Sequence, residues 1–217
     1  MALADVTKIA AIVLAAGSSR RMGEQHKLLV DFNGMSMVSR VVDAVLRSSV
    51  CSATVVIGHR GNEIRTALGA RDVAIVDNPD YGSGLSSSLK VGLSSLPEEI
   101  QGAIIILADM PFVGVDLLEK LIDTFACARE QNIVVPVKSG RMGNPVIWPA
   151  RLFPEMMKLQ GDKGARKLLD EFADQVTTVP VLDDAAFFDI DTPAELEKAN
   201  DRVELALRDS TNQQRFD

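Results

Sequence analysis

The sequence contains few of the residues on which disulfide and metal-cage chemistry usually depends. It has two cysteines, Cys51 and Cys127, and two histidines, His26 and His59, among 217 residues. Two cysteines so far apart cannot build a disulfide framework, and these four side chains make a poor zinc site. We therefore expect a cytoplasmic protein that works in a reducing compartment.

Long apolar runs and dense basic clusters are also missing. The longest apolar runs, Ile9–Ala16 and Ala103–Ala108, are far shorter than the roughly 18 residues that a membrane-spanning helix needs. The net charge is −7, and the acidic excess lies in residues 109–217, with 13 Lys and Arg against 20 Asp and Glu. Nucleic acids and anionic membranes are bound through clustered basic residues. We therefore expect neither as a partner.

Three continuous apolar segments predict buried strands. Hydrophobic residues form 47% of the chain and charged residues 24%, as in ordinary globular proteins. The predicted strands are Ile9–Ala15, Ala53–Ile57 and Ala103–Leu107. The amphipathic segments between and after them predict helices over Met35–Arg47, Asn62–Leu68, Gly84–Leu96 and Val115–Arg129. Unbroken apolar strands that alternate with helices indicate an α/β fold, with a doubly wound, mostly parallel, Rossmann-like sheet.

The pattern changes after about residue 136, but no linker or repeat separates the two parts, so we expect a single domain over residues 1–217. A hairpin is predicted around Ser139-Gly140 and is followed by a Gly-Asn-Pro turn and a strand. Thr192 and Glu195 form a predicted capping box at the start of the last helix. The remaining predicted elements are helices over Arg151–Leu159, Lys163–Phe172 and Pro193 to about Leu207, and a strand over Val176–Val181.

The loop after the first predicted strand is the strongest local signal for ligand binding. Residues 14–27 read LAAGSSRRMGEQHK, so that small residues and two glycines precede Arg20, Arg21 and Lys27. Small residues let a ligand approach the backbone, and converging cations suit a polyphosphate. The loop is not a Walker A motif, because its second glycine is not followed by Lys and Ser or Thr. The alternative is a solvated turn.

Carboxylates that could bind a cation occur at two places in the sequence, directly after a buried strand and in a later loop. Asp109 lies just after the strand Ala103–Leu107, where open α/β sheets bind their ligands and where carboxylates hold Mg²⁺ against phosphates. Its alternative role is to cap the next helix. Asp189 and Asp191 are two residues apart, so in an extended segment they lie on one side of the chain and can share a cation. Their alternative is a solvated loop.

Two glycine-rich loops complete the candidate sites. Gly84 and Ser88 lie where a Gly/Ser loop runs into a helix, an arrangement that suits an anion or a nucleobase edge. The segment 161–166, GDKGAR, carries Lys163 and Arg166 and fits a second anionic ligand. Its alternative is a turn between helices with surface charge.

Taken together and in this order, these segments resemble the MobA-like nucleotidyltransferase superfamily, and within it the molybdenum cofactor cytidylyltransferases. The resemblance covers residues 9 to about 199. It rests on the loop LAAGxSxRMG with its following lysine, and on the segments DMP at 109–111, GNP at 143–145, GDKGAR at 161–166 and DIDTP at 189–193.

The resemblance implies a nucleotide-binding part at about 8–136 and an acceptor-binding part at about 137–208. It implies catalytic roles for Arg21, Lys27 and Asp109. Implied nucleotide-binding residues are Leu14, Ala15, Ala16, Gly17, Arg21, Lys27, Gly84 and Ser88. Asp109 and Asp191 are the implied ligands of Mg²⁺, with Mn²⁺ as an alternative ion. Implied acceptor-binding residues are Asn144, Asp162, Lys163, Arg166 and Asp189.

The resemblance also implies the substrates. In the family LAAG accompanies cytidylyl transfer and LAGG guanylyl transfer, so Ala16 implies transfer of CMP from CTP to the phosphate of molybdopterin, with release of pyrophosphate. Two residues depart from the family pattern. His26 stands where the family often has Asp or Asn, and Met110 stands where the cytidylyltransferases often have Gln. A molybdenum hydroxylase is the implied recipient of the product, and a monomer or weak oligomer is expected.

Other functions remain open at this point. They are cytidylyl or uridylyl transfer to another phosphorylated small molecule, such as a sugar phosphate or methylerythritol phosphate, metal-dependent glycosyl transfer through Asp189 and Asp191, and a catalytically silent molybdopterin chaperone.

Overall fold

The computed structural model describes residues 7–19, 26–128, 131–161 and 165–201. Its strands are β1 (Ile9–Ala15), β2 (Ser52–Ile57), β3 (Ala74–Asp77), β4 (Gly102–Leu107), β5 (Ile133–Lys138), β6 (Arg141–Met142), β7 (Val146–Pro149) and β8 (Val176–Pro180). Its helices are α1 (Met37–Leu46), α2 (Gly61–Leu68), α3 (Leu85–Ser94), α4 (Val115–Cys127), α5 (Phe153–Met156) and α6 (Arg166–Glu171), with a further helix at 193–201.

The strands of the described residues form one mostly parallel sheet in the order β3-β2-β1-β4-β7-β5-β6, with β8 paired to β5. β1 lies between β2 and β4 and is parallel to both. β7 runs antiparallel to β4 and β5, and β6 is antiparallel to β5. The carboxyl ends of β1, β2, β3 and β4 therefore meet at one edge of the sheet, where open α/β sheets bind ligands.

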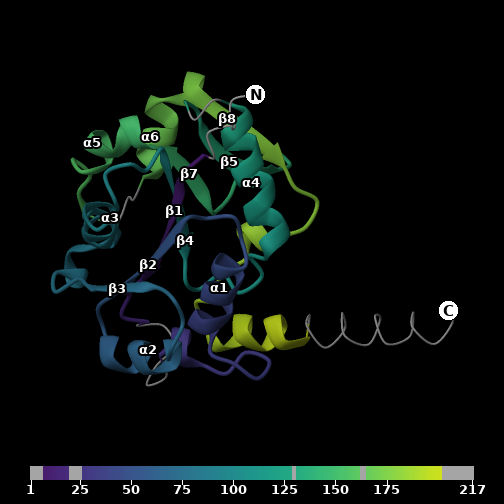
Figure 1. Cartoon of the computed structure of the whole chain (residues 1–217). Coiled ribbons are helices and arrows are strands. Elements are labelled where there is room, and N and C mark those ends of the chain that lie inside the picture. The colour runs from purple at the N-terminus through teal and green to yellow at the C-terminus, as the bar shows by residue number, and fades with distance from the viewer. Residues whose placement is uncertain (1–6, 20–25, 129–130, 162–164, 202–217) are drawn as a thin grey trace, which may run out of the picture.

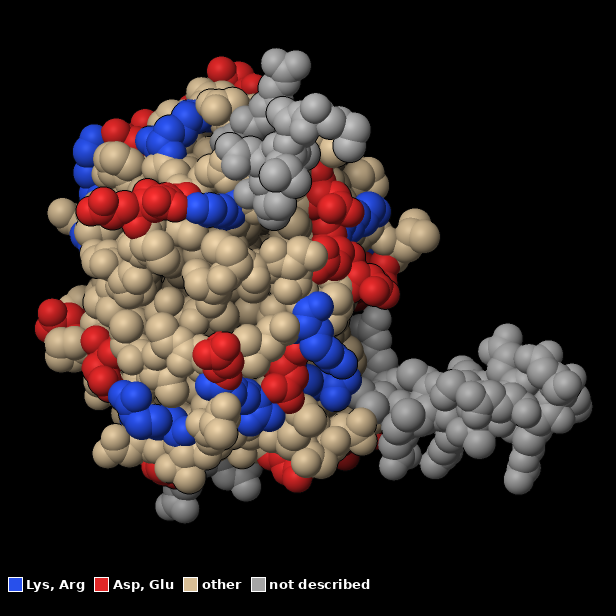
Figure 2. All heavy atoms as spheres, in the orientation of Figure 1, with Lys and Arg blue, Asp and Glu red and all other residues tan. Residues whose placement is uncertain are grey.

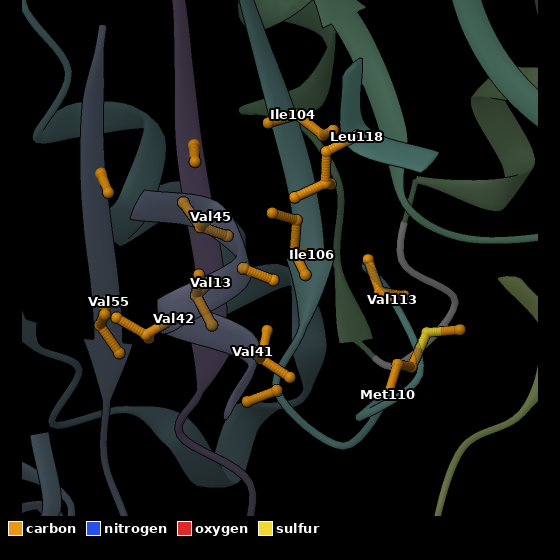
Figure 3. Packing of buried hydrophobic residues seen from close by; sticks show 14 of the residues in the cluster. Val13, Val41, Val42, Val45, Val55, Ile104, Ile106, Met110, Val113 and Leu118 are labelled. Atoms are coloured by element: carbon orange, nitrogen blue, oxygen red, sulfur yellow. The ribbon is translucent and has the colours of Figure 1, made fainter. Parts of the chain in front are cut away.

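Helices cover both faces of the sheet (Figure 1). Side chains of α1, α2 and α4 pack with Val13 and the other alternate residues of β1 in one core. Those of α3, α5 and α6 pack with Ile12 and Leu14 in a second core. Figure 3 shows valines of α1, among them Val41 and Val45, directed at the sheet. This two-sided burial confirms the predicted doubly wound α/β fold, a single domain, and explains why the strand sequences are continuously apolar.

Most predicted elements are present, with a few corrections. β1 matches its predicted bounds, and the hairpin between β5 and β6 turns at Ser139 (φ 51°) and Gly140 (φ 77°), a left-handed pair typical of two-residue hairpins. The predicted helix Arg151–Leu159 was too long, because the chain forms a 3₁₀ turn at Ala150–Leu152 and then the single turn α5. The helix predicted from residue 163 is described from Arg166 onward.

The capping box at the last helix is confirmed. The backbone amide of Glu195 donates to Oγ1 of Thr192 at 3.3 Å, and Oε2 of Glu195 accepts from the Thr192 hydroxyl at 2.9 Å. The part of this helix predicted beyond residue 201 lies outside the described residues. Across the described residues, none of the helices combines the length and apolar character required to traverse a membrane. On the face drawn in Figure 2, acidic and basic side chains are interspersed.

Candidate active site

A cleft of about 440 Å³, here called the first cleft, opens at the carboxyl edge of the sheet beside β1 and β4. The loop after β1, the segment 81–88 and the turn after β4 all contribute to it. Its lining includes Leu14, Ala16, Gly17, Lys27, Gly84, Ser88, Asp109 and Asp191, all of them predicted site residues. Ala15, also predicted to bind nucleotide, is fully buried in the core on the other face of β1.

Lys27 lies between two carboxylates in this cleft. Its Nζ donates to Oδ2 of Asp109 at 2.5 Å and to Oδ1 of Asp191 at 2.6 Å. The three side chains are only 12%, 18% and 22% exposed, respectively. The structure thus joins three predicted residues that come from the beginning, the middle and the end of the chain.

Backbone contacts hold these side chains in place. Asp109 lies in the turn after β4, which is tied to β1 by the hydrogen bond from the Ala108 amide to the Leu14 carbonyl at 3.2 Å. The Ile190 amide donates to the Asp109 carbonyl at 3.0 Å, and this bond brings the segment before the last helix to the sheet edge. The Asp191 amide donates to Oε2 of Glu195 at 2.9 Å, so the capping box also positions Asp191.

Burial and charge shape the protonation of this cluster. Burial alone lowers the pKa of Lys27, but Asp109 and Asp191 outweigh it and raise that pKa above its ordinary value of 10.5. Burial raises the pKa of Asp109, and Lys27 opposes this effect. Lys27 is therefore a firmly charged cation at neutral pH. Oδ1 of Asp109 is buried and has no hydrogen-bond partner among the described residues.

This donor set fits a divalent cation that is completed by substrate. The described residues contain no cluster of three or more His, Cys, Asp or Glu side chains able to hold a metal ion. Mg²⁺, however, is commonly bound by one or two carboxylates together with substrate phosphates and water. The unpartnered oxygen of Asp109 and the neighbouring Asp191 meet that requirement.

The loop that enters α3 forms another wall of the first cleft. Gly84 has φ 103°, a left-handed conformation that favours glycine, and immediately precedes α3. The side-chain amide Nδ2 of Asn78, a residue that is 2% exposed, donates to Oγ of Ser88 at 3.0 Å and to Oγ of Ser87 at 2.9 Å. Asn78 thereby fixes Ser88 beside the cleft.

Three rings, those of His26, His59 and Tyr81, contact one another in series, and Tyr81 lines the first cleft. The His26 and His59 rings are stacked with their centroids 5.6 Å apart, and His59 meets Tyr81 edge-on at 6.0 Å. Burial lowers the pKa of His26 below 6.5, and the charges of His59 and Arg60 act in the same direction. His26, which departs from the family pattern, is thus a buried ring next to Lys27.

A second cleft of about 320 Å³ adjoins the first, and both are lined by Leu14, Leu85 and Leu107. Among the predicted acceptor-binding residues, Asn144, Arg166 and Asp189 line this second cleft. Met110 does so too, which places its departure from the family pattern on the acceptor side. Residues from both sides of position 136 line this second cleft. The predicted division into a nucleotide-binding part and an acceptor-binding part therefore stays a prediction.

Some predicted residues are not assembled as the sequence suggested. Asp189 and Asp191 can share a cation in an extended chain, but the structure places Asp191 in the first cleft and Asp189 in the second. Arg20, Arg21, Asp162 and Lys163 lie outside the described residues.

The sequence analysis missed much of the second cleft. Arg141, Trp148, Leu169 and Phe187 line it but belong to no recognisable motif. For Arg141 and Trp148 the only available signal was their position near the predicted hairpin and the segment GNP.

Comparison with known proteins shows the family of the chain. The MobA-like NTP transferase domain matches residues 11–176. The chain belongs to this family. It is therefore an enzyme of the nucleotidyltransferase class.

Relatives of this family match nearly the whole chain. A molybdenum cofactor cytidylyltransferase of Escherichia coli is 24% identical over 91% of this chain and 98% of its own. A molybdenum cofactor guanylyltransferase of Rhodopseudomonas palustris is 30% identical over 97% and 100%. The solved structure of Rv0371c of Mycobacterium tuberculosis in complex with manganese is 25% identical, with a TM-score of 0.77, and covers 90% of this chain and 99% of that one.

Proposed function

We propose that the protein transfers CMP from CTP to the phosphate of molybdopterin or the molybdenum cofactor, and that pyrophosphate is released in a reaction that depends on Mg²⁺ or Mn²⁺. The observation that carries the proposal is the position of Lys27 between Asp109 and Asp191, in a cleft that adjoins a second one. A cation beside two carboxylates suits a triphosphate, and the adjoining cleft leaves room for the acceptor.

The chemistry requires mainly positioning and charge. An acceptor phosphate oxygen forms a bond to the α-phosphorus of CTP, and the bond from that phosphorus to the bridging oxygen breaks, so the electron pair leaves with pyrophosphate. A phosphate monoester is largely ionised near neutral pH, so this step needs no protein base. Lys27 offsets the charge of the phosphates, and the two clefts hold the reacting groups together.

Asp109 and Asp191 are the residues that would hold the divalent ion. When bound there, the ion supplies positive charge against the phosphate oxygens. Gly84 and the amino end of α3, together with Ser88, supply backbone and hydroxyl groups to the nucleotide. The hydrogen bond from Asn78 holds the Ser88 hydroxyl beside this cleft.

The preference for CTP rests on Ala16. Ala16 lines the first cleft, and its methyl group lies against Gly58. A Cβ added to Gly58 would lie 2.9 Å from the Cβ of Ala16. A glycine at position 16 would leave a wider cleft that favours a purine base. Transfer of GMP is the second candidate, because guanylyltransferase relatives reach 30% identity.

The choice of acceptor rests on the second cleft. Its lining is mostly apolar and includes Trp148, Leu89 and Leu169, with polar side chains from Arg141, Asn144, Arg166 and Asp189. A flat ring system with a phosphate suits this lining better than a sugar phosphate or methylerythritol phosphate, whose hydroxyl groups would lose their water contacts there. We therefore favour molybdopterin, with a molybdenum hydroxylase as the recipient of the product.

One assay separates these possibilities. Pyrophosphate release is measured with CTP, GTP, UTP and ATP, each with and without molybdopterin, a sugar phosphate or methylerythritol phosphate, in the presence and absence of Mg²⁺. We expect release only with CTP, molybdopterin and the divalent ion together. Preferred release with GTP would select the guanylyl alternative. Molybdopterin binding without release from any NTP would indicate the chaperone, and release with another acceptor would replace molybdopterin.

Variants link that activity to the first cleft. Lys27→Ala and Asp109→Ala should each remove most turnover while the far-UV circular dichroism spectrum stays unchanged. Lys158→Ala is the matched control, because Lys158 is an exposed lysine whose ion pair with Glu155 lies on the surface. Near-wild-type kcat in either cleft variant would refute the site.

A further inference from the structure

We infer that Arg141 is a specificity-determining residue that binds the phosphate of the acceptor. The inference deepens the proposed function and rests on it, because the second cleft is the acceptor site only under that proposal. Arg141 lies in β6, a two-residue strand that no sequence motif marked.

The topology places Arg141 at the reactive edge of the sheet. β7 is antiparallel to β4, with Val146 opposite Ile105. The chain that precedes Val146 therefore extends past the carboxyl end of β4, the end at which Asp109 lies. Arg141 lines the second cleft, which meets the first cleft at Leu14 and Leu107. Arg141 therefore lines the cleft that adjoins the proposed CTP site.

The guanidinium group contacts an aromatic ring, and among the described residues no ion pair offsets its charge. Its Cζ lies 5.5 Å from the centre of the Phe187 ring, so an aromatic face supports it without consuming its N–H groups. Among the described residues no carboxylate forms an ion pair with Arg141, although Asp189 lines the same cleft. Asp184, three residues before Phe187, pairs with Lys138 at 2.7 Å.

Arg166 supplies a second cation to the second cleft. Nη2 of Arg166 donates to the Met142 carbonyl at 3.3 Å, which directs this arginine to the same short strand. Two arginines thus line a cleft whose other lining residues are mostly apolar and include Trp148. Planar guanidinium groups match the oxygens of a phosphate in pairs, whereas an apolar wall accepts the body that carries it. The cleft therefore selects a phosphate monoester of an apolar or aromatic group.

Trp148 allows this to be tested without turnover. It is the only tryptophan of the chain and lines the second cleft, so its fluorescence reports occupancy there. Phenyl phosphate is titrated into the wild type and Arg141→Gln, and phenol serves as the probe without phosphate. We expect Arg141→Gln to weaken phenyl phosphate about tenfold or more and to leave phenol unchanged. Arg141→Lys should fall between the two proteins, because it keeps the charge but not the planar fork.

The matched control is Lys138→Gln, which removes the same charge from the same hairpin at a residue that does not line the cleft. It should bind phenyl phosphate as the wild type does. Equal weakening of phenol and phenyl phosphate in Arg141→Gln, or an unchanged affinity for phenyl phosphate, would overturn the inference.

Turnover separates this inference from the proposed function. With molybdopterin and CTP, Arg141→Gln should raise the KM for the acceptor about tenfold and leave the KM for CTP unchanged. Suppose that Arg141→Gln weakens the binding of phenyl phosphate but not of phenol, and that the wild type does not turn over molybdopterin. Molybdopterin would then be rejected as the acceptor, and Arg141 would be retained as the phosphate-binding residue. A higher KM for CTP alone would place Arg141 in the nucleotide site and contradict its assignment.

Discussion

The ammonium group of Lys27 lies 2.5 Å from a carboxylate oxygen of Asp109, although 82 residues separate them in the sequence. The two meet because β1 and β4 are parallel neighbours whose carboxyl ends share one edge of the sheet. Before a nucleotide binds, Lys27 and the carboxylates satisfy one another. Under the proposed function, we expect phosphate oxygens of CTP to compete with Asp109 for Lys27 and to free that carboxylate for a divalent ion.

Asp109→Asn should separate catalysis from folding. The substitution keeps the shape of the side chain but removes the charge, and we expect kcat to fall by at least about 100-fold, because electrostatic stabilisation of the phosphates is lost. Steady-state kinetics and thermal denaturation provide the measurements, with the melting temperature expected to stay within a few degrees. Asp77→Asn, at an exposed carboxylate paired with Arg65, is the control. A kcat within twofold of the wild type would contradict the role of Asp109.

Ala16→Gly should shift the nucleotide preference toward GTP. Removal of the Ala16 methyl group leaves more room at a residue that lines the first cleft, and a difference of this size in a packed pocket changes discrimination by about tenfold. The measurement is the ratio of kcat/KM for CTP to that for GTP. Ala103→Gly, at the amino end of β4 and outside both clefts, controls for the loss of a buried methyl group. An unchanged ratio would show that Ala16 does not select the base.

His26→Phe should weaken the dependence of stability on acid pH. Burial lowers the pKa of His26 in the folded protein below 6.5, so the unfolded chain binds more protons as the pH falls through this range. The wild type therefore loses free energy of unfolding between pH 7 and pH 5. Phe keeps the ring against His59 but cannot be protonated. Urea denaturation at both pH values should show a smaller loss for the variant, and an equal loss would exclude His26 as its source.

Gly92→Ala should destabilise the fold. Gly92 lies in α3 against the sheet, and a Cβ at this position would be 2.5 Å from Cγ2 of Ile12 and 3.1 Å from Cγ2 of Val56. Crowding of this kind costs about 1–3 kcal/mol in the free energy of unfolding. Ser94→Ala, at an exposed position of the same helix, is the control and should not lower stability. A Gly92→Ala protein as stable as the wild type would mean that α3 can move away from the sheet.

The sequence predicted the central strands because burial on both faces leaves a continuous apolar signature, as in β1. It did not predict β3, since Ala74 and Asp77 are exposed and only the two residues between them are half-buried. Such a short edge strand shows neither continuous burial nor a clear alternation. The antiparallel direction of β7 was equally invisible, because pairing direction depends on the path of the whole chain.

The candidate site was predictable where one segment carried several informative residues. Lys27 and Asp109 each follow a buried strand, so their meeting followed from parallel pairing. The separation of Asp189 from Asp191 did not, because it depends on the hydrogen bonds of Ile190 to Asp109 and of Asp191 to Glu195. Arg141 is one of many arginines in the sequence, and only its place on β6 reveals that it lines a cleft.

A crystal structure with Mg²⁺ and α,β-methylene CTP, whose α–β bridge cannot be cleaved, would show where the nucleotide binds. We expect the triphosphate in the first cleft against Lys27, with the ion bound by Asp109. A nucleotide bound elsewhere, or an ion that makes no contact with Asp109, would contradict this expectation.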